Sequence, residues 1–269
     1  MDRRELLGTA AAAAATLATP NLARAAAPLT PPSGRFAQDD QRAAASTAVT
    51  VDAAIVLAAD VSRSIDDEEF ALQRRGYADA IQSQQLIDAI STGPHGAIAL
   101  SYVEWAGDGE ERLVVDWAVI RDQTDARAFV AAMTGAPRSY IGRTAIGTAI
   151  DFSLALFAES AFETDRRVID VSGDGTSNQG RLVTGARDAA VAAGAVINGL
   201  SIFNKKAAAM GGYLALHTNP PGGLAKYYRE NVIGGSGAFV EQIDDFKTFG
   251  DALIRKLVNE VAYAGPRRG

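Results

Sequence analysis

Three oxygen-bearing side chains recur at every second residue directly after an apolar run: Asp60, Ser62 and Ser64 in the stretch LAADVSRSID. One carboxylate and two hydroxyls on a short loop are hard oxygen donors, which Mg²⁺ and similar dications prefer. The same stretch also has a purely structural interpretation, in which Ser64 is the N-cap of a helix whose first turn is acidic. The local pattern therefore leaves metal binding and helix capping both open.

Two further positions offer oxygen donors. Asp174 follows the apolar stretch RRVIDVS, and Thr144 lies between a glycine-containing turn and a helical segment in YIGRTAIGTAID. The carboxyl ends of parallel strands meet at one edge of a sheet, where such folds bind ligands. Asp60 and Asp174 are thus expected to face the same crevice, although Asp174 taken alone is also typical of a turn.

Alternating strand-like and helical segments predict the sheet that these positions require. The Asp108-Gly109 dipeptide predicts a hairpin, hence one antiparallel pair. The last helix has one apolar stripe, which we interpret as core packing. The fold class is therefore α/β, with a doubly wound, mostly parallel central sheet, one antiparallel edge strand and helices on both faces. The expected strands are 53–59, 97–105, 113–119, 168–172, 195–203 and 238–243. The first expected helix follows the first strand and carries Phe70, Tyr77 and Ile81 on one face, and the later ones are 125–133, 145–159, 181–193 and 246–261.

Composition excludes several classes of site. The chain has 269 residues, 48% of them hydrophobic, which is enough for a sizeable core. It has no cysteine, so disulfides, thiolate zinc sites and cysteine nucleophiles are excluded. The net charge of −6, without a basic block, argues against nucleic acid as a partner. Of the two histidines, His217 stands among Thr, Asn and Pro residues, and we interpret it as an exposed loop residue rather than a ligand.

The N-terminal region predicts export. Residues 1–25 contain the pair Arg3 and Arg4, an alanine-rich run and a small-x-small cleavage motif, and they resemble a twin-arginine signal. Residues 26–50 are rich in Pro, Ala, Ser and Thr and are expected to be a flexible linker. The expected domain spans residues 51–262, followed by a tail at 263–269. A bacterial periplasmic or secreted location follows, with no membrane span after signal removal.

The oxygen-bearing motifs together carry a family resemblance. DVSRS resembles the Asp-x-Ser-x-Ser signature of von Willebrand factor type A domains, and GRTAIGTAI is similar to their Gly-x-Thr-x-x-Gly-x-Ala segment. DVSGDGTSN is similar to the Thr-Asp-Gly or Ser-Gly-Asp-Gly motif at the end of one of their strands. The order of the three pieces also matches. The resemblance implies a Rossmann-like fold and a metal-ion-dependent adhesion site for Mg²⁺ or Mn²⁺, with the ligands Asp60, Ser62, Ser64, Thr144 and Asp174. It further implies a protein partner whose acidic group completes the metal coordination, so we expect a binding module and not an enzyme.

Cationic and aromatic residues near this edge are expected to form the rim that contacts the partner. Arg63 and Arg143 flank the predicted ligands, and guanidinium groups there favour an anionic partner. The insertion from Asn204 to Ser236 leaves the carboxyl end of a strand and contributes Lys205, Lys206 and Tyr227. Two alternatives remain open at this stage: a metal-dependent hydrolase of the envelope, and a structural domain with a degenerate metal site.

Overall fold

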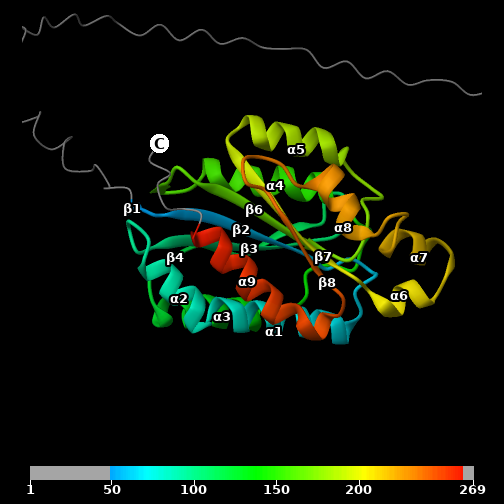
Figure 1. Ribbon diagram of the computed structural model, residues 1–269, viewed down its shortest axis with the longest axis horizontal. Coiled ribbons are helices and arrows are strands. Elements are labelled where there is room, and N and C mark those ends of the chain that lie inside the picture. Colours follow the sequence, from blue (N-terminus) through cyan, green and yellow to red (C-terminus); the bar gives the residue numbers. More distant parts are fainter. Residues whose placement is uncertain (1–48, 263–269) are drawn as a thin grey trace, which may run out of the picture. The chain divides into compact units, whose positions relative to one another are not determined.

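The computed structural model describes residues 49–262, which form an α/β sandwich around one six-stranded sheet (Figure 1). The strand order is β4-β3-β2-β6-β7-β8, and every neighbouring pair is parallel except β3 with β4. These strands are β2 (Ala53–Asp60), β3 (Ile98–Trp105), β4 (Glu111–Ile120), β6 (Arg167–Gly173), β7 (Ala195–Ile202) and β8 (Val240–Ile243). The predicted fold class, including the antiparallel edge strand, is confirmed.

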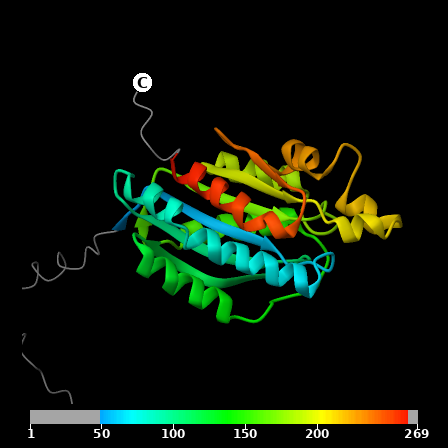
Figure 2. The same cartoon turned by 60° about the horizontal axis from the view of Figure 1, so that its bottom comes forward.

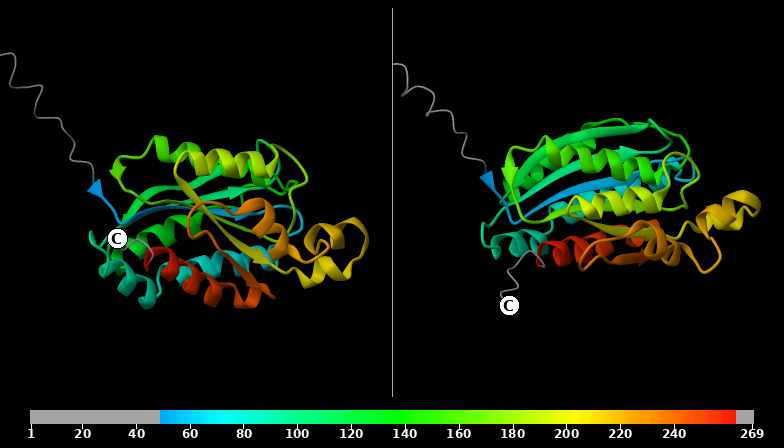
Figure 3. Two further views of the ribbon diagram at one scale, coloured as in Figure 1. Left: turned by 45° about the horizontal axis from the view of Figure 1, so that its top comes forward. Right: turned by 90° about the horizontal axis from the view of Figure 1, so that it is seen from above.

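Helices cover both faces of the sheet (Figure 3). One face is covered by α1 (Asp67–Ile81), α2 (Gln84–Ser91), α3 (Gln123–Gly135) and α9 (Phe249–Ala262), the last following a short 3₁₀ turn, η2 (Phe246–Thr248). The other face is covered by α4 (Ile146–Ala158), α5 (Val183–Ala192), α8 (Leu224–Tyr227) and the π-helical turn η1 (Tyr228–Val232). Strands β2 and β3 are buried on both faces, and β2 is accordingly a continuous apolar run up to Asp60.

The predicted hairpin joins β3 and β4, with Gly109 at a positive φ of 78° in the turn. Helix α2 was not predicted, nor were the short helices of the insertion, which are α6 (Lys205–Ala209), α7 (Gly212–Thr218), α8 and η1. Val49 and Thr50, which the sequence assigned to the linker, form β1 (Val49–Thr50) and pair with β5 (Phe162–Glu163). The predicted signal, the rest of the linker and the tail lie outside the described residues. Within residues 49–262, no helix has the length and apolar character needed to cross a membrane.

Helix α9 packs beside α1 and α2 through its apolar stripe, as predicted (Figure 2). It also buries two charged residues that the stripe did not indicate. Lys256 Nζ lies 2.5 Å from Asp170 Oδ1 of β6 and 2.6 Å from Glu260 Oε1, and all three side chains are fully buried. Glu260 Oε1 also accepts a hydrogen bond of 2.7 Å from Asn198 of β7. This cluster ties the last helix to the two strands beneath it.

Removing the cation of this cluster should destabilise the fold, because two carboxylates would remain buried without a counter-charge. We expect Lys256→Met to lower the free energy of unfolding by about 3–5 kcal/mol, measured by urea denaturation. The matched control is Arg255→Met on the same helix, whose ion pair with Glu241 is solvent-exposed and should contribute under about 1 kcal/mol. Equal losses in the two variants would contradict the stabilising role of the buried cluster.

Candidate functional site

Three segments meet at the carboxyl edge of the sheet and supply the predicted ligands. Strand β2 ends at Asp60, and the adjacent parallel strand β6 ends at Gly173, directly before Asp174. Thr144 lies in the loop that leads into α4, and the residues after Asp60 form the turn that leads into α1. The topology therefore brings donors that are up to 114 positions apart in sequence to one place.

Hydrogen bonds connect all five predicted ligands. Asp60 Oδ1 accepts from the backbone N–H of Ser62 at 2.7 Å, and Ser64 Oγ donates to Asp174 Oδ1 at 2.6 Å. The hydroxyl oxygens of Ser62 and Ser64 are 3.2 Å apart, and those of Thr144 and Ser62 are 3.3 Å apart. Both carboxylates are fully buried, and Ser62 and Thr144 are 1% exposed. The sequence prediction of a single cluster of oxygen donors thus agrees with the geometry.

The two carboxylates of the cluster lie in a strongly perturbed electrostatic environment. Burial raises the pKa of Asp60 to about 8, and the neighbouring Asp174 adds to the rise. Burial also raises the pKa of Asp174 to about 6, although hydrogen bonds from Ser64 and Asn204 act in the opposite direction. Asp60 Oδ2 is buried without a hydrogen-bond partner. A buried acceptor of this kind is costly unless a cation or a donor satisfies it.

The donor set fits a hard cation. Two carboxylates and three hydroxyls are oxygen ligands of the kind that Mg²⁺ and Mn²⁺ accept. In the part of the chain that the structure describes, no group of three or more His, Cys, Asp or Glu side chains is placed to hold a metal ion. Hydroxyl groups would therefore be most of the side-chain ligands of a cation bound at this edge.

Glycine residues on both sides of Asp174 allow neighbouring side chains to approach the strand end. A Cβ atom at Gly173 would lie 2.9 Å from Asp60 Oδ2 and 2.6 Å from the hydroxyl oxygen of Tyr228. A Cβ atom at Gly175 would lie 2.3 Å from His217 Nε2. The glycines of the Gly-Asp-Gly motif are thus needed because other groups occupy the space of their side chains.

The loop that carries the serines is held by Arg138, a residue that the sequence did not single out. Its guanidinium group donates to the backbone carbonyls of Val61, Ser62 and Ile65 at 2.8, 3.1 and 2.8 Å. No local motif marks Arg138, because its partners lie more than 70 positions earlier in the chain. Its contribution is to fix the backbone that presents Ser62 and Ser64.

Asn204 is a second residue that the sequence did not identify. Its side-chain amide donates to Asp174 Oδ2 at 2.8 Å and to the carbonyl of Ser64 at 2.9 Å. Its side-chain oxygen accepts from the backbone N–H of Ala207 at 2.9 Å and so caps α6. The sequence did place Asn204 just after the carboxyl end of a predicted strand, and this position could have indicated that it lies near the cluster. Through these bonds Asn204 joins the start of the insertion to the cluster.

The helix cap proposed for Ser64 is wrong. Asp66 is the N-cap of α1, and it forms a reciprocal capping box with Glu69, at 2.8 Å for the Glu69 N–H and 3.0 Å for the Asp66 N–H. Ser64 instead directs its hydroxyl toward Asp174. Capping therefore explains the acidic run after residue 65 but not the serine before it.

The interpretation of His217 as an exposed loop residue is also wrong. His217 lies near the end of α7 and is only 5% exposed. Its Nε2 atom is 3.2 Å from Thr144 Oγ1, and its Nδ1 atom is 3.2 Å from Thr176 Oγ1. Burial lowers the pKa of the imidazole, which favours the neutral form. The neighbouring Thr, Asn and Pro residues are typical of an exposed turn, but a tertiary contact with Thr144 buries this end of α7.

Arg63 and Arg143 lie where the rim was predicted. Both side chains are exposed, and both line a cavity of about 280 Å³ next to Ser64 and Thr144. Tyr213, Leu214 and His217 of α7 line the same cavity. The cavity thus places two cations and part of the insertion beside the oxygen donors.

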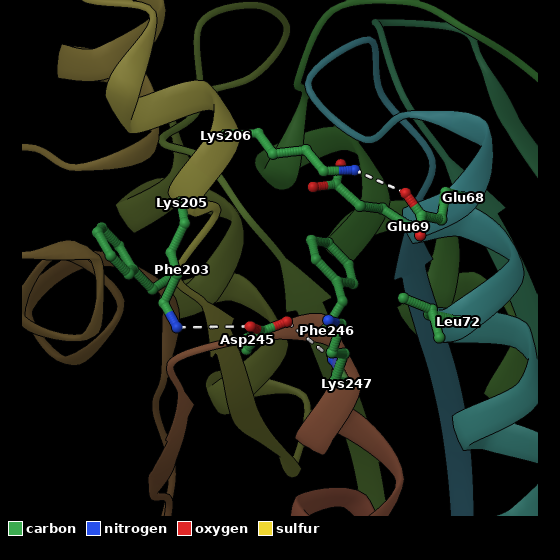
Figure 4. Close-up of a pocket in the computed structure, with 9 residues that line it drawn as sticks. All are labelled: Glu68, Glu69, Leu72, Phe203, Lys205, Lys206, Asp245, Phe246 and Lys247. Atoms are coloured by element: carbon green, nitrogen blue, oxygen red, sulfur yellow. Dashed lines mark hydrogen bonds and ion pairs between the residues drawn. The ribbon is translucent and has the colours of Figure 1, made fainter.

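The other three predicted rim residues lie in different surroundings. Lys206 Nζ is 2.8 Å from Asp66 Oδ2. Figure 4 shows its 3.0 Å contact with Glu68 Oε2 and the 3.4 Å contact between Lys205 Nζ and Asp245 Oδ2. The Tyr227 hydroxyl accepts from the backbone N–H of Ser177 at 3.1 Å. None of the three lines the cavity, and their role in partner binding stays a prediction.

Comparisons with known proteins give a family and a fold. The family model described as "Protein of unknown function (DUF1194)" matches residues 50–265. No curated protein matches the chain significantly.

Four solved structures, which represent three proteins, illustrate the fold. Proximal thread matrix protein 1 from the mussel byssus has a TM-score of 0.58 at 14% identity, over 80% of this chain and 49% of that one. Another structure of that protein, with a zinc-occupied MIDAS motif, has a TM-score of 0.54 at 15% identity, over 80% and 49%. A von Willebrand factor type A protein from Catenulispora acidiphila has a TM-score of 0.52 at 14% identity, over 78% and 43%.

The third is the pilus adhesin SpaC from Lactobacillus rhamnosus GG, with a TM-score of 0.55 at 14% identity, over 80% of this chain and 31% of that one. The chain thus spans less than half the length of each of these proteins. At this level of identity the likeness shows the fold alone, and that fold is the von Willebrand factor type A fold predicted from the sequence.

Neutralising the buried carboxylate of Asp60 should stabilise the ion-free chain. The pKa of Asp60 is about 8 in the folded state against an ordinary 3.8, so folding takes up a proton between about pH 4 and pH 8. Stability is therefore lost as the pH rises through this window. We expect Asp60→Asn, in the presence of a chelator at pH 8, to raise the free energy of unfolding by about 1–3 kcal/mol, with a smaller gain at pH 5. Urea denaturation measures both values.

The control for this prediction is Asp116→Asn, because the Asp116 side chain is exposed and its substitution should leave stability unchanged. A loss of stability in Asp60→Asn at pH 8 would show that the Asp60 carboxylate is satisfied without a bound cation.

Proposed function

The chain belongs to the DUF1194 family of proteins of unknown function, and we propose that it is a divalent-cation-dependent protein-binding module of the bacterial cell envelope. The observation that carries this proposal is the buried Asp60 carboxylate, whose Oδ2 atom lacks a partner next to three connected hydroxyl groups. Asp60, Ser62, Ser64, Thr144 and Asp174 would hold Mg²⁺ or Mn²⁺. A bound ion would supply a coordination position that an acidic group of a partner protein completes.

Residues around the predicted ligands hold them in position in the absence of a partner. Arg138 and Asn204 fix the serine loop and the Asp174 carboxylate, as ligand-orienting partners do in metal sites. Arg63 and Arg143 lie beside the cavity, where their charge attracts an anionic group. Both features suit the recognition of an acidic partner better than the packing of a purely structural domain.

A metal-dependent hydrolase is the second candidate, and His217 is the observation that favours it. Its imidazole is 3.2 Å from Thr144 Oγ1 and could serve as a proton acceptor. Both ring nitrogens, however, lie against threonine hydroxyls, which leaves no free nitrogen for a water molecule. We therefore favour the binding module and assign His217 the role of orienting the Thr144 hydroxyl.

The location of the module follows from the predicted export signal. The arginine pair and the alanine-rich run at residues 1–25 support a periplasmic or secreted protein, carried by the twin-arginine route. Such an envelope location would give the site access to partners outside the cytoplasm.

Metal binding should depend on the carboxylate and on the hydroxyl from the third segment. We expect saturable binding of Mg²⁺ or Mn²⁺ by isothermal titration, weakened at least about tenfold in Asp60→Ala and in Thr144→Ala. The controls are Asp116→Ala and Thr92→Ala, both exposed in the structure. Absence of binding in every form of the chain, or equal binding in all of them, would refute the proposed function.

Removal of the His217 imidazole should weaken the same binding, because the Thr144 hydroxyl loses the contact that orients it. We expect His217→Ala to reduce metal affinity by about tenfold and His217→Gln to restore part of it, since an amide can also hydrogen-bond. His95→Ala is the matched control, because His95 is exposed. Unchanged affinity in His217→Ala would remove His217 from the site.

A further inference from the structure

Exposed apolar side chains gather on the segments next to the cavity. The structure describes seven large apolar residues with exposed side chains, and four of them belong to these segments. Ile141 is 60% exposed and precedes Gly142 and Arg143, which line the cavity. On the other side are Met210 after α6 and Tyr213 and Leu216 on α7, which are 75%, 66% and 63% exposed. A local group of exposed apolar side chains of this kind is typical of an interaction site.

Contacts at the C-terminal end of α7 hold this helix in place, although several of its apolar side chains remain in solvent. His217 and Thr218 are buried, and the carbonyl of His217 accepts a 3.0 Å hydrogen bond from the backbone N–H of Thr176. Tyr213 and Leu216, three positions apart, share a side of the helix, and the Tyr213 ring stacks on His217 at 5.8 Å between centroids. In two views, α6 and α7 project beyond the carboxyl edge of the sheet (Figures 1 and 3). The helix is therefore anchored through His217 and Thr218 at its C-terminal end, whereas Tyr213 and Leu216 remain exposed.

Charge adds the second property of this surface. Arg63 and Arg143 are exposed and line the same cavity. Neither forms an ion pair with a carboxylate in the part of the chain that the structure describes. Two uncompensated cations in a chain with a net charge of −6 indicate a local preference for an anionic occupant.

The size of the cavity limits what can enter it. Its volume of about 280 Å³ is at the lower limit of the range of about 300–1,000 Å³ typical of small-molecule sites. It is open next to Ser64 and Thr144 and is lined by Tyr213 and Leu214. A single large apolar side chain fits these dimensions and this lining better than a complete organic ligand.

We propose that this surface binds a segment of a partner protein in which an acidic residue is followed directly by a large apolar or aromatic residue. This inference rests on the proposed function, because the acidic side chain completes the metal site. The following side chain enters the cavity and packs against Tyr213 and Leu214. Arg63 and Arg143 draw the acidic segment to the site, and Ile141, Met210 and Leu216 cover its flanks.

An anionic membrane is the competing occupant for an apolar surface with nearby cations. Membrane-binding helices carry a broad basic side beside their apolar side. The lysines of α6 do not provide one, because Lys206 pairs with Asp66 and Glu68 and Lys205 pairs with Asp245. The two free cations instead line a concave cavity, which favours a protein segment.

Three fluorescein-labelled peptides test this proposal against the full chain: Gly-Gly-Asp-Phe-Gly-Gly, the same peptide with Asn in place of Asp, and the same peptide with Gly in place of Phe. Fluorescence anisotropy measures binding in Mg²⁺ and in a chelator. We expect the Asp-Phe peptide to bind in Mg²⁺ only, the Asn-Phe peptide not to bind, and the Asp-Gly peptide to bind about tenfold more weakly.

Variants of the chain show whether the apolar surface is responsible. We expect Leu214→Ser to weaken the Asp-Phe peptide about fivefold or more while leaving the Asp-Gly peptide and metal titration unchanged, because Leu214 lines the cavity. Leu182→Ser is the matched control, since Leu182 is 73% exposed but does not line the cavity. It should leave the binding of every peptide unchanged.

Different results overturn the inference in distinguishable ways. Equal, metal-dependent binding of the Asp-Phe and Asp-Gly peptides would overturn it and leave the proposed function standing. Absence of peptide binding to a chain that binds metal would do the same. Peptide binding that persists in the chelator would overturn both. Binding to phosphatidylglycerol vesicles that is lost in Tyr213→Ser would overturn the inference in favour of a membrane surface.

Discussion

The burial of two carboxylates at the ends of adjacent parallel strands is the constraint on which this structure depends. Asp60 and Asp174 are fully removed from water; burial and the neighbouring Asp174 raise the pKa of Asp60, and the Asp174 carboxylate accepts hydrogen bonds from Ser64 and Asn204. Buried acids without a counter-charge are unfavourable. The chain places hydroxyls and amides around them and leaves one oxygen of Asp60 without a partner. A bound cation would offset the free-energy cost of burying these carboxylates, whereas a turn without a ligand would not.

The rest of the fold fixes the geometry of these two residues. Strands β2 and β6 are buried in the centre of the sheet, so their ends cannot move independently. Arg138 holds the serine loop, and Asn204 connects Asp174 to the insertion. Asp170 of β6, the strand that directly precedes Asp174, contacts the buried lysine of α9. The last helix is therefore attached to the strand that leads into a predicted ligand, and the sheet acts as a rigid support for the edge.

The insertion contributes differently from what its basic residues suggested. Lys205 and Lys206 are engaged by acidic side chains near their own helix, whereas His217 reaches Thr144 and Tyr213 borders the cavity. Specificity in α/β folds often lies in loops at the carboxyl edge of the sheet. Here His217, buried near the C-terminal end of α7, contacts the oxygen donors, and the exposed Tyr213 and Leu216 are available to a partner. One short helix can thus couple the metal-ligand cluster to the choice of partner.

The sequence by itself determined the fold class and the positions of most strands, and it predicted the five oxygen donors, because these depend on local periodicity and on short motifs. Strand ends and Gly-Asp-Gly turns are encoded by neighbouring residues, so Asp60 and Asp174 could be assigned to the same edge. Only the tertiary structure placed Arg138, Asn204, Lys256 and His217. Each acts on partners tens of positions away, and no local pattern distinguishes a buried residue of this kind from an exposed one. For His217, the contact with Thr144 across 73 positions decided its burial.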